Sequence, residues 1–123
     1  MEALATSEYV EQKSRFIGLA FKLADSTEFK NIKAEIKKEH PSASHITHAY
    51  KCGTICSVSD DREPPHTAGS QILSEIQRAN KNNIAVVVVR YFGGKKLGKK
   101  NLILAYRTAA AQTISNLKET QCQ

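Results

Sequence analysis

The stretch IAVVVVRYF, residues 84–92, limits the possible folds of this chain more than any other segment. Its early positions are all apolar and include four valines in a row. Valine and isoleucine favour strands, and a strand without polar alternation is typical of one that is covered on both faces. The sequence therefore predicts a fully buried strand over residues 84–92.

A glycine pair, Gly93 and Gly94, follows this strand, and four lysines then occur within residues 95–100. Glycine allows a positive φ and a close approach of backbone to a ligand. A helix expected just afterwards would point free N–H groups and a partial positive charge outward, so that each exposed lysine nearby costs about 0.3–1 kcal/mol. The pattern favours a loop that faces an anion. The alternative is a tight turn with solvated lysines, and Asn101 after Lys100 argues against a nucleoside-triphosphate loop.

Charge is divided unevenly along the chain. Residues 1–75 contain 9 Lys/Arg and 11 Asp/Glu, whereas residues 76–123 contain 9 Lys/Arg and a single acid, Glu119. Such polarity indicates an attraction for phosphate groups or for an acidic protein surface, and a merely solvated basic face is the alternative.

The remaining segments predict an α+β fold. We expect a long first strand over residues 9–21, followed by a helix that Asp25 or Ser26 caps and Pro41 ends. A hairpin of strands 46–51 and 54–59 comes next. Two more helices are expected, one with Thr67 as its N-cap and an Asn-rich end, and a final one over about residues 100–117. The resulting order is βαββαβα. It predicts a two-layer sandwich whose helices lie on one side of a mostly antiparallel sheet.

Length and composition indicate one domain. The chain has 123 residues, 41% hydrophobic and 24% charged, which argues against disorder. Residues 1–12 are expected to be a frayed segment or the start of the first strand, and residues 13–123 the single domain. Uncharged runs are too short to cross a bilayer and no leader opens the chain, so a soluble cytoplasmic protein is expected. Cys52, Cys56 and Cys122 are odd in number, which fits a reducing compartment.

The stretch SDDREPPHTAG, residues 59–69 and here called the acidic loop, is the second candidate site. Asp60, Asp61, Glu63 and His66 could hold Mg²⁺ or Mn²⁺ or provide a general base. The alternative is a structural loop whose carboxylates favour the following helix N-terminus and pair with the lysines of residues 95–100.

Two further sites are disfavoured by the residue pattern. His45, His48, Cys52 and Cys56 lack the usual zinc spacing, and strand alternation sends the two histidines to opposite faces. Either cysteine would need a base and an oxyanion donor to act as a nucleophile, and a packed thiol is the commoner outcome. Aromatic residues near arginines, at 15–16 and 90–92, give a weak signal for single-stranded nucleic acid.

Several motifs in the expected order resemble those of the Impact/YigZ family. They are KSRFIGLA (13–20), HPSASHITHAYK (40–51), SDDREPPHTAGSQIL (59–73), VVVVRYFGGKKLG (86–98) and LAYRTAA (104–110). The resemblance implies a fold similar to the second domain of ribosomal protein S5. It also implies a role in translation control: eukaryotic Impact proteins restrain, through a ribosome-associated activator, the kinase that responds to amino-acid starvation. Bacterial relatives are suggested to bind nucleic acid or act in translation, and the family has no agreed catalytic set.

Departures from the family pattern lie in both candidate loops. Arg62 stands where the family usually has glycine, and Pro65-His66 replace a pair of small residues. After Gly98 the bacterial form continues with glycines and an arginine, whereas this chain has Lys99, Lys100 and Asn101. The change favours electrostatic recognition over a glycine-rich backbone cradle. The RWD domain of eukaryotic members and the ferredoxin-like domain of bacterial members have no counterpart in these residues.

Three functional hypotheses follow from the sequence. The first is a non-enzymatic regulatory module that binds a protein of the translation-control pathway through one cleft between the acidic loop and the basic glycine loop of residues 93–100. The second is RNA or single-stranded nucleic-acid binding through residues 90–107. The third is an enzyme centred on Asp60, Asp61 and His66. No cofactor, metal or catalytic residue is predicted, and the predicted cleft consists of Asp60, Asp61, Glu63, Thr67, Arg90, Tyr91, Gly93, Gly94, Lys95, Lys96, Gly98, Lys99 and Lys100.

Overall fold

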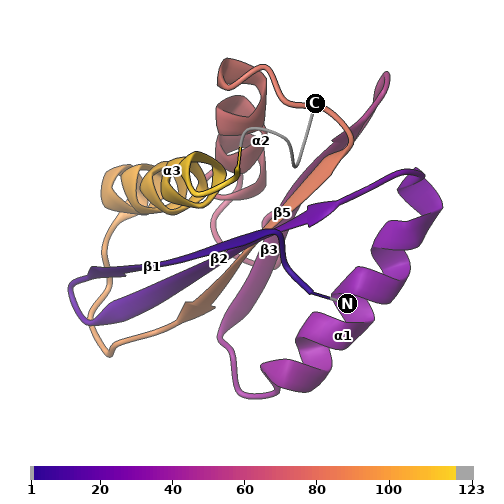
Figure 1. Ribbon diagram of the computed structural model, residues 1–123. Helices are drawn as coiled ribbons and strands as arrows, with labels where there is room; N and C mark the ends of the chain where they lie inside the picture. The colour runs from indigo at the N-terminus through magenta and orange to yellow at the C-terminus, as the bar shows by residue number, and fades with distance from the viewer. Residues whose placement is uncertain (1, 119–123) are drawn as a thin grey trace.

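The computed structural model describes residues 2–118, and its centre is a five-stranded antiparallel sheet (Figure 1). The strands lie in the order β1 (Ala5–Glu11), β2 (Ser14–Lys22), β5 (Ile84–Tyr91), β3 (His45–Cys52) and β4 (Ile55–Ser59). The central strand β5 pairs with β2 on one side and with β3 on the other. Residues 84–90 are all buried, which confirms the predicted strand.

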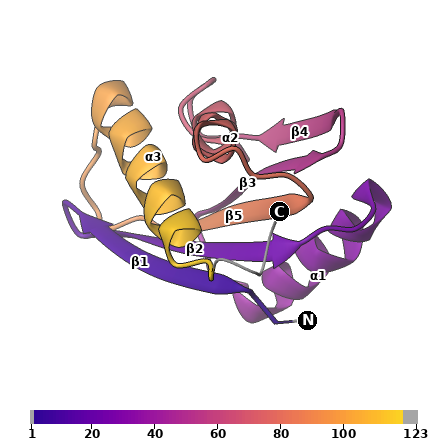
Figure 2. The same cartoon turned by 45° about the horizontal axis from the view of Figure 1, so that its top comes forward.

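Helices cover both faces of this sheet, so the predicted two-layer sandwich with all helices on one side is wrong. Helix α1 (Phe29–Glu39) lies on one face, while α2 (Gly69–Arg78) and α3 (Lys99–Ser115) lie on the other (Figures 1 and 2). The valines of β5 show why. Val86 and Val88 belong to the core beneath α2 and α3, whereas Val87 and Val89 belong to the core beneath α1. A strand that is apolar on both faces requires a covering layer on each.

The predicted first strand over residues 9–21 is two strands joined by a tight turn. Glu11 pairs with Ser14, which leaves Gln12 and Lys13 as a two-residue loop. Both have positive φ, 46° and 69°, as a type I′ hairpin turn requires. The element order is therefore ββαββαβα rather than βαββαβα.

The other predicted elements are confirmed, with shifts at their ends. The hairpin of β3 and β4 turns at Gly53, whose φ is +64°. Asp25 caps a 3-10 turn, η1 (Ser26–Glu28), that leads into α1, and Glu28 completes a capping box. Thr67 is not the N-cap of α2, because that position is Ala68, which has no side-chain cap. Cys52 and Cys56 are free thiols, and Cys122 lies outside the described residues. No helix among residues 2–118 has the length and apolarity that spanning a membrane requires.

Candidate functional site

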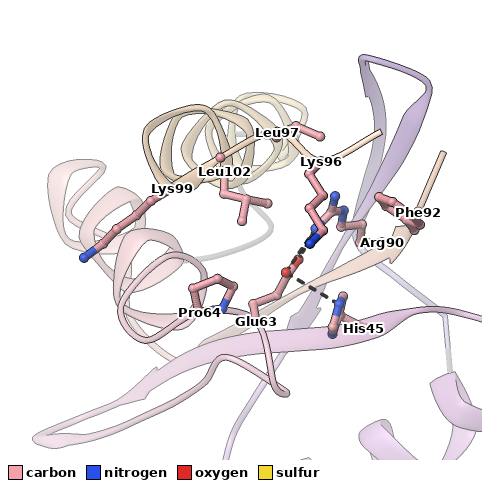
Figure 3. A pocket seen from close by; sticks show the side chains of 10 residues that line it. His45, Glu63, Pro64, Arg90, Phe92, Lys96, Leu97, Lys99 and Leu102 are labelled. Carbon is pink, nitrogen blue, oxygen red and sulfur yellow. Dashed lines mark hydrogen bonds and ion pairs between the residues drawn. The ribbon is translucent and has the colours of Figure 1, made fainter. Parts of the chain in front are cut away.

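A cavity of about 360 Å³ opens at the end of β5, between the acidic loop and the segment that enters α3 (Figure 3). Several elements line it: β3, the acidic loop, β5, the loop before α3 and the first turn of α3. The lining residues are His45, Glu63, Pro64, Arg90, Phe92, Lys96, Leu97, Gly98, Lys99 and Leu102. The two loops that the sequence predicted to be neighbours therefore both contribute to one cavity.

Glu63 and Arg90 form a buried ion pair in this cavity. Arg90 Nη1 lies 3.0 Å from Glu63 Oε1 and 2.8 Å from Oε2, and the two side chains are only 5% and 3% exposed. Glu63 Oε1 also lies 3.5 Å from His45 Nε2, and its Oε2 accepts a hydrogen bond from the Tyr106 hydroxyl. Groups from three other elements therefore contact the Glu63 carboxylate. Figure 3 shows the contacts made by His45 and Arg90.

Burial and the charge of Glu63 raise the pKa of Tyr106 far above the ordinary tyrosine value. The phenol therefore remains protonated and serves as a hydrogen-bond donor to Glu63. Arg90 also donates from Nη2 to Ser14 Oγ at 3.2 Å, and its guanidinium lies over the rings of Phe16 and Phe92 at 5.5 and 5.6 Å. Its Nε is buried and has no acceptor among residues 2–118.

Apolar side chains form the walls of the cavity and lysines form its rim. Pro64, Phe92, Leu97 and Leu102 supply the apolar surface. Glu63 is paired with Arg90, so the exposed Lys96 and Lys99 leave the rim positively charged. Within residues 2–118, none of the four lysines at 95, 96, 99 and 100 makes an ion pair, so the pairing with the acidic loop that was considered as an alternative does not occur.

The two aspartates of the acidic loop lie outside the cavity lining and instead hold the backbone in place. Asp60 Oδ1 accepts hydrogen bonds from the N–H groups of Ala68 and Gly69, and its Oδ2 accepts one from His66. Asp60 therefore supplies the N-terminal cap of α2 that Thr67 was expected to supply. Asp61 Oδ2 accepts from the N–H of Ile46 at 2.6 Å and fixes the start of β3.

A comparison with protein-family models finds a match over residues 12–114, to the Impact N-terminal domain. The chain belongs to the Impact family. Among curated relatives, the Bacillus subtilis family member YvyE is 35% identical over 89% of this chain, and a Thermus thermophilus member is 39% identical over 84%. These alignments cover 52% and 56% of the relatives, so the chain spans about half the length of the proteins it matches.

Two solved structures share the fold. One, described only as a hypothetical protein, has a TM-score of 0.90 and 31% identity over 97% of this chain and 59% of its own. The other is the two-domain translational regulator Yih1, with a TM-score of 0.56 and 21% identity over 90% of this chain and 46% of its own. The Yih1 likeness concerns the fold.

Five of the predicted cleft residues line the cavity of this Impact-family domain: Glu63, Arg90, Lys96, Gly98 and Lys99. Tyr91 lies on the opposite face of the sheet, where its hydroxyl hydrogen-bonds His40 Nδ1. Thr67 is buried and donates to the Pro64 carbonyl. Gly93 packs closely against Lys13 of the β1–β2 turn, where an added Cβ would lie 2.2 Å from that residue's carbonyl group. Gly94, Lys95 and Lys100 are exposed beyond the lining.

The remaining lining residues were not among the predicted cleft residues, although Phe92, Leu97 and Leu102 lie within the range 90–107 that was expected to bind nucleic acid. His45 was considered only as a zinc ligand, although its expected separation from His48 is confirmed: His45 faces Glu63, and His48 packs on Phe29 of α1. Leu97 and Leu102 resemble ordinary core residues in sequence. Pro64 lies in the motif of residues 59–73, and Phe92 and Leu97 lie in the motif of residues 86–98, so membership of a motif was the signal that could have identified them.

Proposed function

We propose that this Impact-family domain is a non-enzymatic binding module that acts in translation control under amino-acid starvation and binds a protein partner through the cavity between its two loops. The supporting observation is the state of the carboxylates. Asp60 and Asp61 accept hydrogen bonds from backbone N–H groups, and Glu63 is held by Arg90 and Tyr106. Carboxylates committed in this way organise a surface, whereas a general base needs access to the proton that it abstracts.

The link to translation draws on family relationship and on Yih1. The translational regulator Yih1 has the same fold, and the chain belongs to the Impact family, for which a role in translation control is expected. The positive rim supports an anionic partner, because exposed lysines over an apolar cavity attract acidic groups and speed their association.

The test is capture of the partner from a cell lysate by the immobilised chain, followed by identification of the bound species. Lys96→Glu combined with Lys99→Glu reverses the rim charge and is expected to abolish capture. Lys37→Glu combined with Lys38→Glu makes the same charge change on α1, on the opposite face of the sheet, and should capture normally. Undiminished capture by the rim variant would exclude the cavity as the binding site.

RNA is the second candidate partner, because the half-exposed Phe92 lies beside Arg90 and lines the cavity together with Lys96 and Lys99. An RNA complex would lose affinity steeply with salt, by about one log unit per log unit of salt for each phosphate contact. Captured material that is nuclease-sensitive and shows this slope would favour RNA. A nuclease-resistant protein partner with a shallow salt slope would favour the first candidate.

A further inference from the structure

We propose that the cavity binds one bulky apolar side chain of an acidic peptide segment, whose carboxylates lie against Lys96 and Lys99. The inference rests on the proposed function and specifies the partner's chemistry. It follows from the shape and lining of the cavity, from the arrangement of charge around it and from two sets of unsatisfied donors at its edge.

The walls suit a single apolar anchor. Leu97 and Leu102 are 6% and 5% exposed and belong to the core beneath α2 and α3, so their positions are fixed before any partner binds. Phe92 is 49% exposed and continues the apolar surface outward from the cavity. A volume of about 360 Å³ lies at the lower end of the ~300–1,000 Å³ typical of ligand pockets. It has room for one large side chain, and a buried anchor of that kind commonly dominates a peptide interface.

The charge around the cavity extends farther than a small acid would need. Lys96 and Lys99 line the cavity, while Lys95 and Lys100 are exposed outside it, and none of the four has an acidic partner within residues 2–118. One small carboxylate could meet only part of this cluster. An acidic chain that continues past its anchor could contact all four lysines.

Two sets of donors on residues that line the cavity also have no protein acceptor within residues 2–118. Gly98 precedes α3 as its N-cap and supplies no side-chain cap. The first N–H groups of this 17-residue helix therefore have no intrahelical acceptor and carry its partial positive charge. Arg90, which also lines the cavity, has a buried Nε with no acceptor within residues 2–118. Carboxylate oxygens of a bound segment are the type of acceptor that such an edge favours.

The lining favours a peptide over RNA. Surfaces that bind single-stranded nucleic acid stack successive bases on several exposed aromatic rings. Phe92 is the one exposed aromatic side chain among the lining residues, and the other apolar walls are aliphatic or proline. A concave aliphatic wall complements a leucine-like or phenylalanine-like side chain better than a flat base.

Fluorescence anisotropy with short labelled probes tests the inference on the whole chain. The reference probe has a central leucine flanked by aspartates and glutamates. A second probe replaces leucine by serine, a third replaces the acids by asparagine and glutamine, and a fourth is an oligouridylate of equal charge. We expect the reference probe to bind, and each change of anchor or charge to weaken binding by about tenfold or more.

Protein variants locate the site. Lys96→Glu with Lys99→Glu should weaken the reference probe by about tenfold or more, and Lys37→Glu with Lys38→Glu should leave its affinity unchanged. Phe92→Ser, at an exposed rim position, should weaken the leucine probe more than the serine probe. Equal affinity for those two probes, tighter binding of the oligouridylate or no binding of any probe would overturn the inference.

Competition separates this inference from the proposed function. If the reference probe displaces the partner captured from lysate, both are supported. If capture depends on Lys96 and Lys99 but the probe neither binds nor competes, only the acidic-peptide inference fails. If the rim variant captures the partner as well as the wild type does, the cavity itself is excluded.

Discussion

His48 illustrates how neighbours, rather than residue type, decide what a side chain contributes. It lies on β3 with its ring 4.3 Å from Phe29 and stacked on Tyr50, and it is 6% exposed. Neither ring nitrogen has a hydrogen-bond partner in the part of the chain that the structure describes. Burial, followed by the charge of Lys33, lowers the pKa of His48 from 6.5 to about 4, and Asp61 opposes the shift only in part. The fold therefore holds this imidazole neutral.

Acidification should consequently destabilise the protein through His48. The unfolded chain takes up a proton near pH 6.5 and the folded chain only near pH 4, so this contribution to stability is complete above pH 6.5 and decreases as the pH falls toward 4. The loss is at most about 3 kcal/mol. His48→Phe removes the titration and keeps the aromatic stack. Urea unfolding of both proteins between pH 7 and pH 4 should show a stability difference that grows in favour of the variant, and parallel curves would contradict this account.

At the scale of strands and helices, the residues in each turn determined whether a hairpin could be recognised from the sequence. The β1–β2 turn escaped detection because it consists of Gln12 and Lys13 rather than the asparagine-glycine or aspartate-glycine pairs that mark such hairpins. The β3–β4 hairpin was recognised because glycine occupies its positive-φ position. A turn built from residues that avoid positive φ gives no sequence signal, even though the structure contains it.

That turn should be improvable. Gln12→Asn combined with Lys13→Gly supplies residues that accept the observed φ values of 46° and 69°, and we expect a gain of about 0.5–1 kcal/mol in the free energy of unfolding. The urea midpoint should rise with an unchanged slope. Gln12→Val combined with Lys13→Val is the opposing control and should lower the midpoint, because β-branched residues tolerate positive φ poorly. A midpoint that moves the same way in both variants would show that backbone conformation does not limit this turn.

The charged residues of the candidate site could be predicted from the sequence, whereas the apolar residues that packing brings to the cavity could not. Five residues that stand out in the sequence line the cavity: Glu63, Arg90, Lys96, Gly98 and Lys99. Asp60 and Asp61 stand out equally in the sequence, but their carboxylates accept hydrogen bonds from backbone N–H groups and do not line the cavity. Sequence shows that a carboxylate is present but not which donor occupies it. Leu97 and Leu102 line the cavity because of how the loop before α3 and the first turn of α3 lie on the sheet, which no local pattern encodes.

On the scale of the whole molecule, the Glu63–Arg90 pair is the point where separate parts of the chain meet. Through it the acidic loop and β5 contact Ser14 on β2, His45 on β3 and Tyr106 on α3. The helix layer of α2 and α3 is thereby joined to the central strands of the sheet by polar contacts as well as by its apolar core. The β5 valines contribute apolar contacts on both faces of the sheet, because alternate valines pack beneath α2 and α3 on one face and beneath α1 on the other.

Removing one member of this pair should be far more damaging than removing both. Glu63→Leu leaves Arg90 buried without its carboxylate, and Arg90→Met leaves Glu63 buried without its guanidinium, so each should cost about 3–5 kcal/mol of stability. The double variant should lose much less than the sum of the single losses, since no unpaired charge remains. The exposed pair of Arg15 and Glu8, 2.9 Å apart, is the matched control, and Glu8→Leu there should leave stability close to wild type. The measurement is urea unfolding of the wild type, both single variants and the double variant. If the double variant loses the sum of the two single losses, Glu63 and Arg90 do not stabilise the fold through their interaction.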